Sequence, residues 1–556
     1  MSLLRTLPMV LLVASVVNAS PSPSFFIRTN QLGFRPDDLK SAVILSHQDL
    51  SGGRFEIVRA GENAAVFNGG IGRTRGSYGK FEYQYRVEFS MFEDPGIYVV
   101  RVLGEASCPF TINEAVYDRV VDSLMLFFRV QRCGSAGALL HGPCHPHDIT
   151  GLITGGIVHR KMIGASGGWH DAGDYVKFLN TTAYTTYTLL FAYEFDPKVF
   201  SFDHDGNGVP DVLDEATVGL EWLLKLRLGD QTLITQVQDL RDHDQGWRLP
   251  ENDELSDDRP GFTGMGKNLI GILSATMALA YRLRVNDLHD HTFAERCLTL
   301  AENLYSVRKS VPDLDSSGSG MYRDKGYTGK MALGAVELYL ATGRAAYLSD
   351  ARKYAMAAGS DFWWSWGDIN SYAHYRLASL DTKFGSYVKK NLLASNDLSH
   401  SHPFGESATG TWGSCNAMLG AALQAALWKR LTGQSVFDTL AARQRDYVLG
   451  CNPWGVSFIS GIGVNPAAHF HSQVAYLNGG YLPGGLAAGP VTASVLRQYS
   501  IKVERPDPYQ EFQTEESVYR DDRMDYVTNE PTIAAAATAV FVMGCQSSRG
   551  RSHVTN

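Results

Sequence analysis

The pattern of hydrophobic and polar positions divides the chain into two regions. Between residues 24 and 113, short β-rich runs alternate with turns that contain Gly, Pro, Asn and Asp. Examples are Ser41–Leu45, Arg54–Val58, Tyr83–Val87 and Ile97–Val102. Regularly spaced short strands of this kind predict a small β-sandwich. Because this region has no cluster of histidines or carboxylates, we expect it to have a structural role.

From about Val116 onward, the apolar positions follow the period of a helix instead. One stripe at positions i, i+3, i+4, i+7 and i+8 consists of Leu419, Ala422, Leu423, Ala426 and Leu427. Lys429, Arg430 and Gly433 follow it, as is typical of a helix C-terminus. Similar runs cover residues 216–228, 268–283, 330–342 and 532–543. We therefore predict an all-α toroid of many helices over residues 117–546, with the functional site on its loops.

Length and charge narrow the class of protein. The chain has 556 residues, more than one hydrophobic core usually supports, so two domains are expected. The net charge of −8 provides no basic surface for nucleic acid, which we exclude as a partner. We expect a monomer.

Residues 1–19 have the pattern of a signal peptide. Arg5 precedes an apolar run from Leu7 to Val17, and Ala19 ends a short segment suited to cleavage. The run is too short to span a membrane well, and no later segment is long and apolar enough. We expect the mature protein to be exported, either secreted or periplasmic, and not embedded in a membrane.

The stretch Gly167–Phe178, with the sequence GGWHDAGDYVKF, is the strongest candidate for chemistry. Asp171 and Asp174 lie three residues apart across an Ala-Gly link, so both carboxylates can point into one cavity. A pair of this kind can hold and deprotonate a water molecule. The alternative for an isolated pair is a helix N-cap with a solvated neighbour.

Several motifs along the mature chain together resemble glycoside hydrolase family 9, a family of inverting cellulases with an (α/α)6 barrel. The motifs are Gly167–Phe178, Asn207–Ala216, Trp412–Ser414, Gly463–Pro466 and Asp521–Glu530. Residues 27–34 also resemble the start of the immunoglobulin-like domain that precedes many such barrels. The resemblance implies an immunoglobulin-like β-sandwich at 24–113, followed by an all-α (α/α)6 barrel.

The resemblance also assigns the acid and the base. It makes Asp174 the general base, with Asp171 sharing the water, and Glu530 the general acid. An inverting glycosidase needs two such groups about 6.5–9.5 Å apart. Since Pro531 and an apolar run follow Glu530, a helix N-terminus there would favour the ionised glutamate. Burial, or the charge of Asp525 and neighbouring carboxylates, must therefore raise its pKa.

Substrate contacts are expected from a histidine and from aromatic rings in polar loops. The resemblance makes His471 a sugar-binding residue beside the cleavage point. The other residues that we assign to the substrate are Trp247, Trp412, Tyr519 and Asp525. The family usually continues His-His-Arg, but this chain has Gln473 in place of the arginine, and the segment 242–247 is one residue longer than usual. Both departures bear on the sugar preference and on endo action.

Two metal sites are predicted. Asp203, Asp205, Asn207, Val209, Asp211 and Asp214 fall in a loop with EF-hand spacing, which suits calcium, except that position 12 is Asp. Cys133, Cys144, His145 and His170 could form a Cys2His2 zinc site, as in related barrels with the extra β-domain. The alternatives are an Asn-Gly turn with a capping Asp, and unconnected thiols. Seven cysteines are few and odd in number for a disulfide scaffold.

Three functions compete at this point. The first is hydrolysis of β-1,4-linked glucans with inversion. The second is exo action on short oligosaccharides, as a β-glucosidase or an exo-β-glucosaminidase, for which the acidic stretch 504–525 could hold an amino sugar. The third is a carbohydrate-binding protein without activity, which the presence of Asp171, Asp174 and Glu530 together disfavours.

Overall fold

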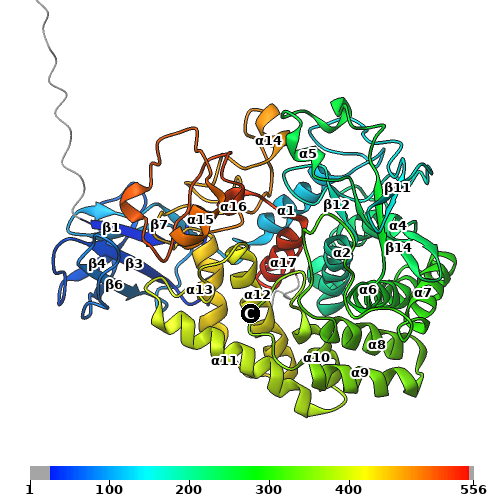
Figure 1. Cartoon of the computed structure of the whole chain (residues 1–556). Helices are drawn as coiled ribbons and strands as arrows, with labels where there is room; N and C mark the ends of the chain where they lie inside the picture. Colours follow the sequence, from blue (N-terminus) through cyan, green and yellow to red (C-terminus); the bar gives the residue numbers. More distant parts are fainter. Residues whose placement is uncertain (1–24, 550–556) are drawn as a thin grey trace, which may run out of the picture.

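The computed structural model describes residues 25–549. Strands fill the first part and helices the second, and the strands form a body at one edge of the helical part (Figure 1). The predicted signal peptide lies outside the described residues. No helix in the described part is long and apolar enough to cross a bilayer.

The N-terminal body is a β-sandwich, as predicted. One sheet has the order β1-β3-β6, with β1 at Phe25–Thr29, β3 at Ser41–Ser46 and β6 at Tyr83–Glu88. The other has the order β2-β9-β7-β4-β5, with β8 paired to β7. Its strands are β2 (Gly33–Phe34), β4 (Arg54–Arg59), β5 (Ala65–Gly70), β7 (Gly96–Val102), β8 (Glu105–Ala106) and β9 (Phe110–Ile112). Alternating burial along these strands places rings such as Phe34, Tyr98 and Phe110 between the sheets.

The helical part is an (α/α)6 barrel. Six helices form a closed inner ring in which each packs against the next: α2 (Leu179–Phe195), α6 (Lys267–Asn286), α8 (Thr328–Thr342), α10 (Asn370–Ala378), α12 (Ser414–Thr432) and α17 (Ile533–Gly544). Six outer helices cover them: α1 (Asp118–Gln131), α4 (Asp211–Leu223), α7 (His291–Ser306), α9 (Ala345–Ala358), α11 (Gly385–Ser401) and α13 (Asp438–Val448). The predicted all-α class is confirmed.

Helix α12 shows where the periodic pattern was sufficient and where it was not. It ends at Thr432, and Gly433 follows in the left-handed conformation at φ 70°, as the C-terminal signal predicted. The prediction of a single apolar stripe was too narrow, because α12 is buried on nearly all sides. An inner helix contacts both the ring and the outer layer, so polar residues such as Gln424 are buried too.

A small mixed sheet within the barrel loops was not predicted. Its order is β11-β10-β15-β14-β12, with β13 beside β14. The strands are β10 (Leu152–Thr154), β11 (Ile157–His159), β12 (Lys177–Phe178), β13 (Arg227–Gly229), β14 (Thr232–Val237) and β15 (Gly261–Gly264). β13 occupies the end of the run 216–228, which was predicted to be helical. β12 connects the Asp171–Asp174 loop to α2, so this sheet supports the candidate site.

Polar contacts join the two bodies. Asn30 donates to the Asp446 carboxylate at 2.9 Å, and the Gln31 amide donates to the Leu449 carbonyl at 2.9 Å. Arg28 donates to the Pro453 carbonyl at 3.0 Å. These buried contacts fix the sandwich against the barrel.

Candidate active site

The loop that carries Asp171 and Asp174 is held from both sides by barrel helices. Gln131, the last residue of α1, donates from Nε2 to the carbonyls of His170 at 3.1 Å and Ala172 at 2.6 Å. The amide of Ile533, the first residue of α17, donates to the Asp171 carbonyl at 3.0 Å. The loop is therefore fixed by its backbone, which leaves its carboxylates available.

Asp171 lies in a buried environment with one free acceptor. The Thr181 hydroxyl on α2 donates to Oδ1, whereas Oδ2 has no hydrogen-bond partner among the described residues. Burial raises the pKa of Asp171 to about 7, against the hydrogen bond from Thr181 and the nearby Tyr322 hydroxyl, which lower it. An unpaired buried carboxylate oxygen is costly unless water or substrate meets it.

Asp174 is held as an anion. The Val176 amide donates to Oδ1 at 2.9 Å, and His243 Nε2 donates to Oδ2 at 2.7 Å. Burial alone would raise the pKa of Asp174, but the hydrogen bond and charge of His243 outweigh it, so the pKa is lowered. The same hydrogen bond raises the pKa of His243 to about 9. The two form an ion pair at neutral pH.

Glu530 faces the same loop in the opposite protonation state. It follows the short helix α16 (Tyr526–Asn529), and its Oε1 accepts a hydrogen bond from the Gly173 amide at 3.1 Å. Burial, followed by the charge of Asp174, raises the pKa of Glu530 well above its usual range. Glu530 lies before the N-cap of α17 and not in the first turn of that helix. The charges that raise its pKa are those of Asp174 and Asp171, whereas the sequence had suggested Asp525.

Gly173 makes this approach possible. A Cβ atom at position 173 would lie 2.0 Å from the His471 carbonyl oxygen and 3.2 Å from Glu530 Oε1. No other residue fits there without moving the backbone. One carboxylate with a lowered pKa and one carboxyl with a raised pKa thus meet at Gly173. That pairing can remove a proton from one group and deliver a proton to another.

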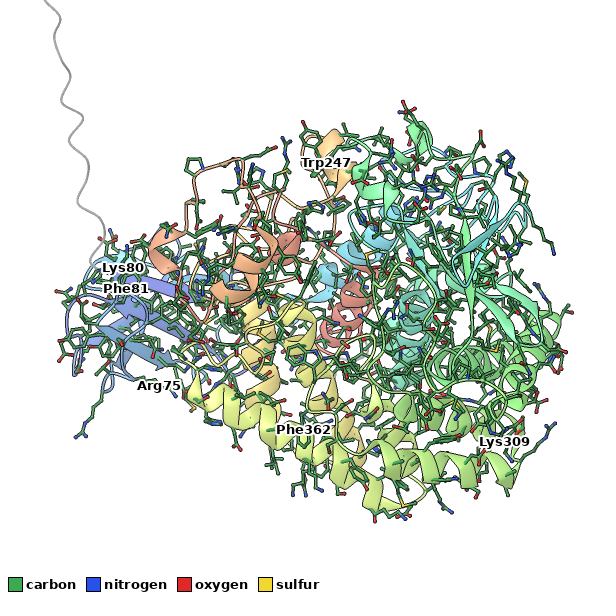
Figure 2. The ribbon with its side chains drawn as sticks, viewed as in Figure 1. Arg75, Lys80, Phe81, Trp247, Lys309 and Phe362 are labelled. Carbon is green, nitrogen blue, oxygen red and sulfur yellow. The ribbon has the colours of Figure 1, made fainter. Side chains whose placement is uncertain are left out.

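Three of the predicted substrate residues lie in one series of ring contacts. His471 contacts Trp247 at 5.4 Å and Tyr526 at 5.7 Å between ring centroids, and Trp412 contacts Tyr526 at 5.8 Å. Tyr476 extends the series beyond Trp247, and Tyr499 extends it beyond Trp412. Trp247 lies next to α14 (Gln473–Leu477), as Figure 2 shows.

His471 is a neutral donor within this series. Its Nδ1 donates to the Arg523 carbonyl at 2.7 Å, and burial lowers its pKa. On the other side of the loop, Tyr322 contacts Phe178 at 4.8 Å and Trp366 at 5.4 Å. Burial and then the charges of Asp171 and Glu530 raise the pKa of Tyr322, which places it near both groups.

Two of the predicted substrate residues, Tyr519 and Asp525, are fully buried in the structure. The Tyr519 hydroxyl donates to Asn529 at 2.9 Å, and its ring packs on Phe458. Asp525 accepts from the amides of Val527 and Thr528 as the N-cap of α16. Neither presents a surface to a sugar, and both support the segment that carries Glu530.

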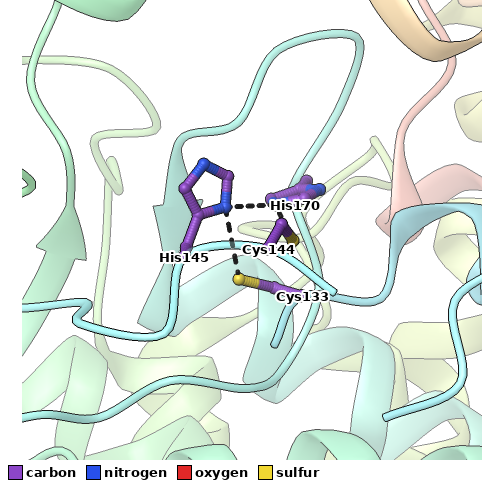
Figure 3. Close-up of side chains that lie close together, drawn as sticks. All are labelled: Cys133, Cys144, His145 and His170. Atoms are coloured by element: carbon purple, nitrogen blue, oxygen red, sulfur yellow. Dashed lines mark hydrogen bonds between the residues drawn. The ribbon is translucent and has the colours of Figure 1, made fainter. Parts of the chain in front are cut away.

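The side chains of the predicted zinc site do converge (Figure 3). Cys133, Cys144, His145 and His170 are all buried, and their ligand atoms lie within 4.8 Å of one another. Cys133 Sγ lies 3.7 Å from His145 Nδ1, Cys144 Sγ lies 3.9 Å from His170 Nε2, and the two imidazole nitrogens are 3.2 Å apart. A tetrahedral zinc site has edges of about 3.3–3.8 Å. The four residues therefore fit this ion.

The surroundings of the cluster also suit a metal. His145 Nε2 is 3.0 Å from Asp253 Oδ2, and a ligand histidine usually has such a carboxylate partner. Lys177 contacts Cys133 Sγ at 3.5 Å and forms an ion pair with Asp148. Because His170 immediately precedes Asp171, the cluster is connected directly to the catalytic loop.

The predicted calcium loop is exposed and only partly convergent. Asp203, Asp205 and Asp211 have carboxylate oxygens within 4.8 Å of one another. Both carboxylate oxygens of Asp203 already accept hydrogen bonds from backbone amides. The Gly206 amide donates to Oδ1 at 2.8 Å, and the Gly208 amide donates to Oδ2 at 2.9 Å. The side chains of Asn207 and Asp214 are hydrogen-bonded to each other, and the Val209 amide donates to Asn207 Oδ1 at 2.7 Å.

Comparison with known families agrees with this geometry. The sequence model described as "Glycosyl hydrolase family 9" matches residues 117–543, and that of "Cellulase N-terminal ig-like domain" matches residues 23–107. The chain belongs to glycosyl hydrolase family 9. It is a glycosidase that hydrolyses O-glycosyl bonds.

Two relatives match this family 9 enzyme over most of its length. Endoglucanase D of Acetivibrio thermocellus is 25% identical over 501 residues, which cover 84% of this chain and 78% of that protein. A xyloglucan-specific endo-beta-1,4-glucanase of Bacteroides ovatus is 26% identical over 543 residues, covering 86% and 88%.

Solved structures of family 9 endoglucanases have the same fold as this chain. The crystal structure of a metagenome-derived family 9 endoglucanase has a TM-score of 0.82 at 27% identity, covering 94% of this chain and 99% of that one. A Zn-binding triple mutant of another family 9 endoglucanase has a TM-score of 0.78 at 23% identity, covering 92% and 99%, and so shares the fold.

Sequence reasoning missed His243 and Thr181, which hold the two aspartates. His243 lies in the lengthened segment 242–247, and its position beside an acidic residue was the available signal. Tyr526, Tyr476 and Tyr499 were also missed as members of the aromatic series. Sequence spacing alone could not separate them from the other tyrosines of the chain.

Proposed function

We propose that this family 9 glycosidase cleaves β-1,4-linked glucans by a single displacement that inverts the anomeric carbon. Asp174 removes a proton from the attacking water, Asp171 orients that water, and Glu530 protonates the leaving oxygen. The observation that carries this proposal is the opposite tuning of Asp174 and Glu530 on either side of Gly173. A base must be ionised and an acid must be protonated before the reaction begins.

The roles follow from the contacts. His243 keeps Asp174 ionised and directs its Oδ2, whereas Asp171 Oδ2 is free to accept from a water molecule. As the glycosidic bond breaks, the leaving oxygen takes the proton of Glu530, while the water loses one to Asp174. His471 Nε2 remains available for a sugar hydroxyl, because Nδ1 is committed to Arg523.

A glucan substrate is supported by the aromatic residues and by the relatives. Trp412, Tyr499 and Tyr476 are about two-fifths exposed, at 40%, 41% and 42%, so they offer ring faces to pyranose C–H groups. The series extends on both sides of His471. A long chain with internal cleavage suits such a series better than a closed pocket, and the relatives named above are endoglucanases.

The structure offers no specific support for an amino sugar. Asp521 accepts from the amides of Ala468 and His469, and Asp522 accepts from the amides of Glu504 and Arg505. The Glu504 carboxylate itself pairs with Arg523 at 2.6 Å. These three carboxylates are therefore committed to the fold, which weakens the reason for preferring glucosamine.

The cofactors proposed are structural. Zinc would be held by Cys133, Cys144, His145 and His170, where it would fasten the catalytic loop and leave no open coordination position. Calcium would be held by Asp203, Asp205 and Asp211 at the start of α4, with Asn207 and Asp214 rearranged toward it. We also propose export, on the pattern of residues 1–19 alone.

Proton NMR during hydrolysis of cellotetraose, with viscometry of a soluble β-glucan, tests the function. We expect the α-anomer to appear first and viscosity to fall well before reducing ends accumulate. A β-anomer as the first product would exclude the assigned roles. Release of monomer alone, without a fall in viscosity, would replace endo action by exo action.

A further inference from the structure

Gln473 stands where the family pattern has an arginine, and its contacts show what takes over that position. The Gln473 amide donates to the Gly173 carbonyl at 3.1 Å, within the catalytic loop. Its side-chain Oε1 accepts from Arg248, from the backbone N at 3.1 Å and from the guanidinium at 3.4 Å. The buried Gln473 therefore connects the loop between Asp171 and Asp174 to Arg248.

Arg248 is the centre of a buried charge network. Its guanidinium donates to Asp242 Oδ1 at 2.7 Å and to Asp253 Oδ1 at 2.8 Å, and it lies 5.2 Å from the centroid of the Tyr175 ring. The Arg248 side chain is 10% exposed, and both aspartate side chains are 0% exposed. Two buried carboxylates thus share one planar fork, which a lysine cannot reproduce.

The two aspartates lead to different parts of the site. Asp242 accepts from the Tyr175 amide at 3.0 Å and directly precedes His243, which holds Asp174 at 2.7 Å. Asp253 leads instead to the metal cluster, through His145 at 3.0 Å. Arg248 therefore lies between Asp242, which precedes the histidine that holds the base, and Asp253, which contacts the proposed metal ligand His145.

We propose that Arg248 is a positioning residue for Asp174, a role that presupposes the function proposed above. It fixes the segment 242–248 through Asp242 and the catalytic loop through Gln473, with Asp253 as its anchor on the Cys2His2 side.

The network is asymmetric, and the asymmetry makes the proposal testable. Asp253 has a second cation, because Arg259 lies 3.6 Å from Asp253 Oδ2 and also pairs with Asp148 at 2.6 Å. For Asp242, Arg248 is the cation within salt-bridge distance in the described part of the chain, and the charge of Arg259 acts on Asp242 without a direct contact. Loss of Arg248 should therefore disturb the base and leave the metal cluster in place.

The main variant is Arg248→Met, with Arg248→Lys and Gln473→Leu beside it. We expect Arg248→Met to lower kcat on cellotetraose about a hundredfold with little change in KM, since a displacement of about 1 Å can have that effect. Gln473→Leu should lower kcat about tenfold. Arg248→Lys should recover part of the loss, because it restores one ion pair. Zinc per chain should stay at the wild-type value in all three.

Arg376→Met is the matched control. Arg376 is 11% exposed and pairs with the buried Glu337 at 2.7 Å in a network that contains no residue of the site. The Arg376→Met variant should lower the melting temperature as Arg248→Met does, but its kcat per folded molecule should stay at the wild-type value. Equal losses of kcat in the two variants would show that Arg248 contributes to stability only and does not position Asp174.

Asp253→Asn tests the part of the network that leads from Arg248 through Asp253 to His145. Asn retains an acceptor for Arg248 but removes the acceptor for His145, so zinc affinity should fall about tenfold to a hundredfold. With excess zinc, its kcat should stay within about threefold of wild type. Loss of zinc in Arg248→Met but not in Asp253→Asn would overturn the proposed division of the network.

NMR of histidine-labelled protein separates this inference from the proposed function. The pKa of His243, about 9 when it is paired with Asp174, can be followed whatever sugar the enzyme cleaves. Arg248→Met should lower it toward the ordinary histidine value, since the pairing is lost. An unchanged pKa would contradict the positioning role even if the wild type proves inactive on glucans.

Discussion

The two sides of the proposed catalytic centre present the same chemical group in opposite environments. On one side, Asp174 accepts hydrogen bonds from the Val176 amide and from a charged His243. On the other side, Glu530 accepts one hydrogen bond from the Gly173 amide and lies beside the negative charge of Asp174. Both carboxyl groups experience burial, which by itself favours the neutral form. The number and charge of the donors decides which group stays ionised.

The comparison shows why the two groups have to be close together. The negative charge of Asp174 is the second cause of the raised pKa of Glu530, after burial. A base that keeps its charge therefore also keeps its partner protonated. Each of the following changes alters one side and tests the role assigned to it.

The largest effect is expected from Asp174→Asn. Without an ionised base, hydrolysis should fall roughly ten-thousandfold on both glucans and aryl glycosides, because water activation is needed whatever group leaves. The control is added azide, which attacks without deprotonation and should restore part of the activity. Normal rates in Asp174→Asn would transfer the role of base to Asp171.

Glu530→Gln should have the next largest effect, and it should depend on the leaving group. Natural glucans should react roughly a thousandfold more slowly, since Gln cannot deliver a proton. An aryl glycoside with a good leaving group should lose much less. Steady-state rates on the two substrates provide the measurement, and equal losses on both would contradict the acid role.

The fold was largely predictable because its signals are local. Apolar repeats at 268–283, 330–342 and 532–543 predicted helices within a few residues of α6, α8 and α17. The small sheet of β10–β15 was not predictable, since its strands have two to six residues and pair across long loops. The all-round burial of α12 depends on neighbours that a single helical pattern does not reveal.

The site was predictable where a motif is continuous and not where contacts are distant. Asp171 and Asp174 share one motif, whereas His243 contacts Asp174 from 69 positions along the chain. The burial of Tyr519 and Asp525 was not predictable, because proximity to Glu530 in the sequence does not tell which side chains are exposed. Both point into the fold instead.

His243→Gln sharpens the comparison on the base side. His243 lowers the pKa of Asp174, and the base acts only when ionised, so activity is lost as the pH falls through that pKa. Without His243 the pKa of Asp174 should rise, and the acidic limb of the pH profile of kcat should move to higher pH. The alkaline limb, assigned to Glu530, should move less. A shift of the alkaline limb alone would indicate that His243 acts on Glu530.

The smallest effect on rate is expected from the metal sites, and it should also separate the two sides. Cys144→Ser removes a ligand from the buried cluster that includes His170, next to Asp171, whereas Asp205→Ala changes the exposed loop before α4. Because a buried site has no water to replace the lost ligand, Cys144→Ser should lose zinc and lower the melting temperature by several degrees. Asp205→Ala should lower the melting temperature less, and only when calcium is present.

With either variant kcat should stay within about tenfold of wild type, and Cys144→Ser should move the acidic limb of the pH profile while leaving the alkaline limb in place. The measurements are metal content after dialysis, thermal unfolding with and without calcium, and the pH profile of kcat. Full zinc content in Cys144→Ser would show that the cluster holds no zinc, and the loop would then be held by contacts such as those from Gln131, Ile533 and Gln473.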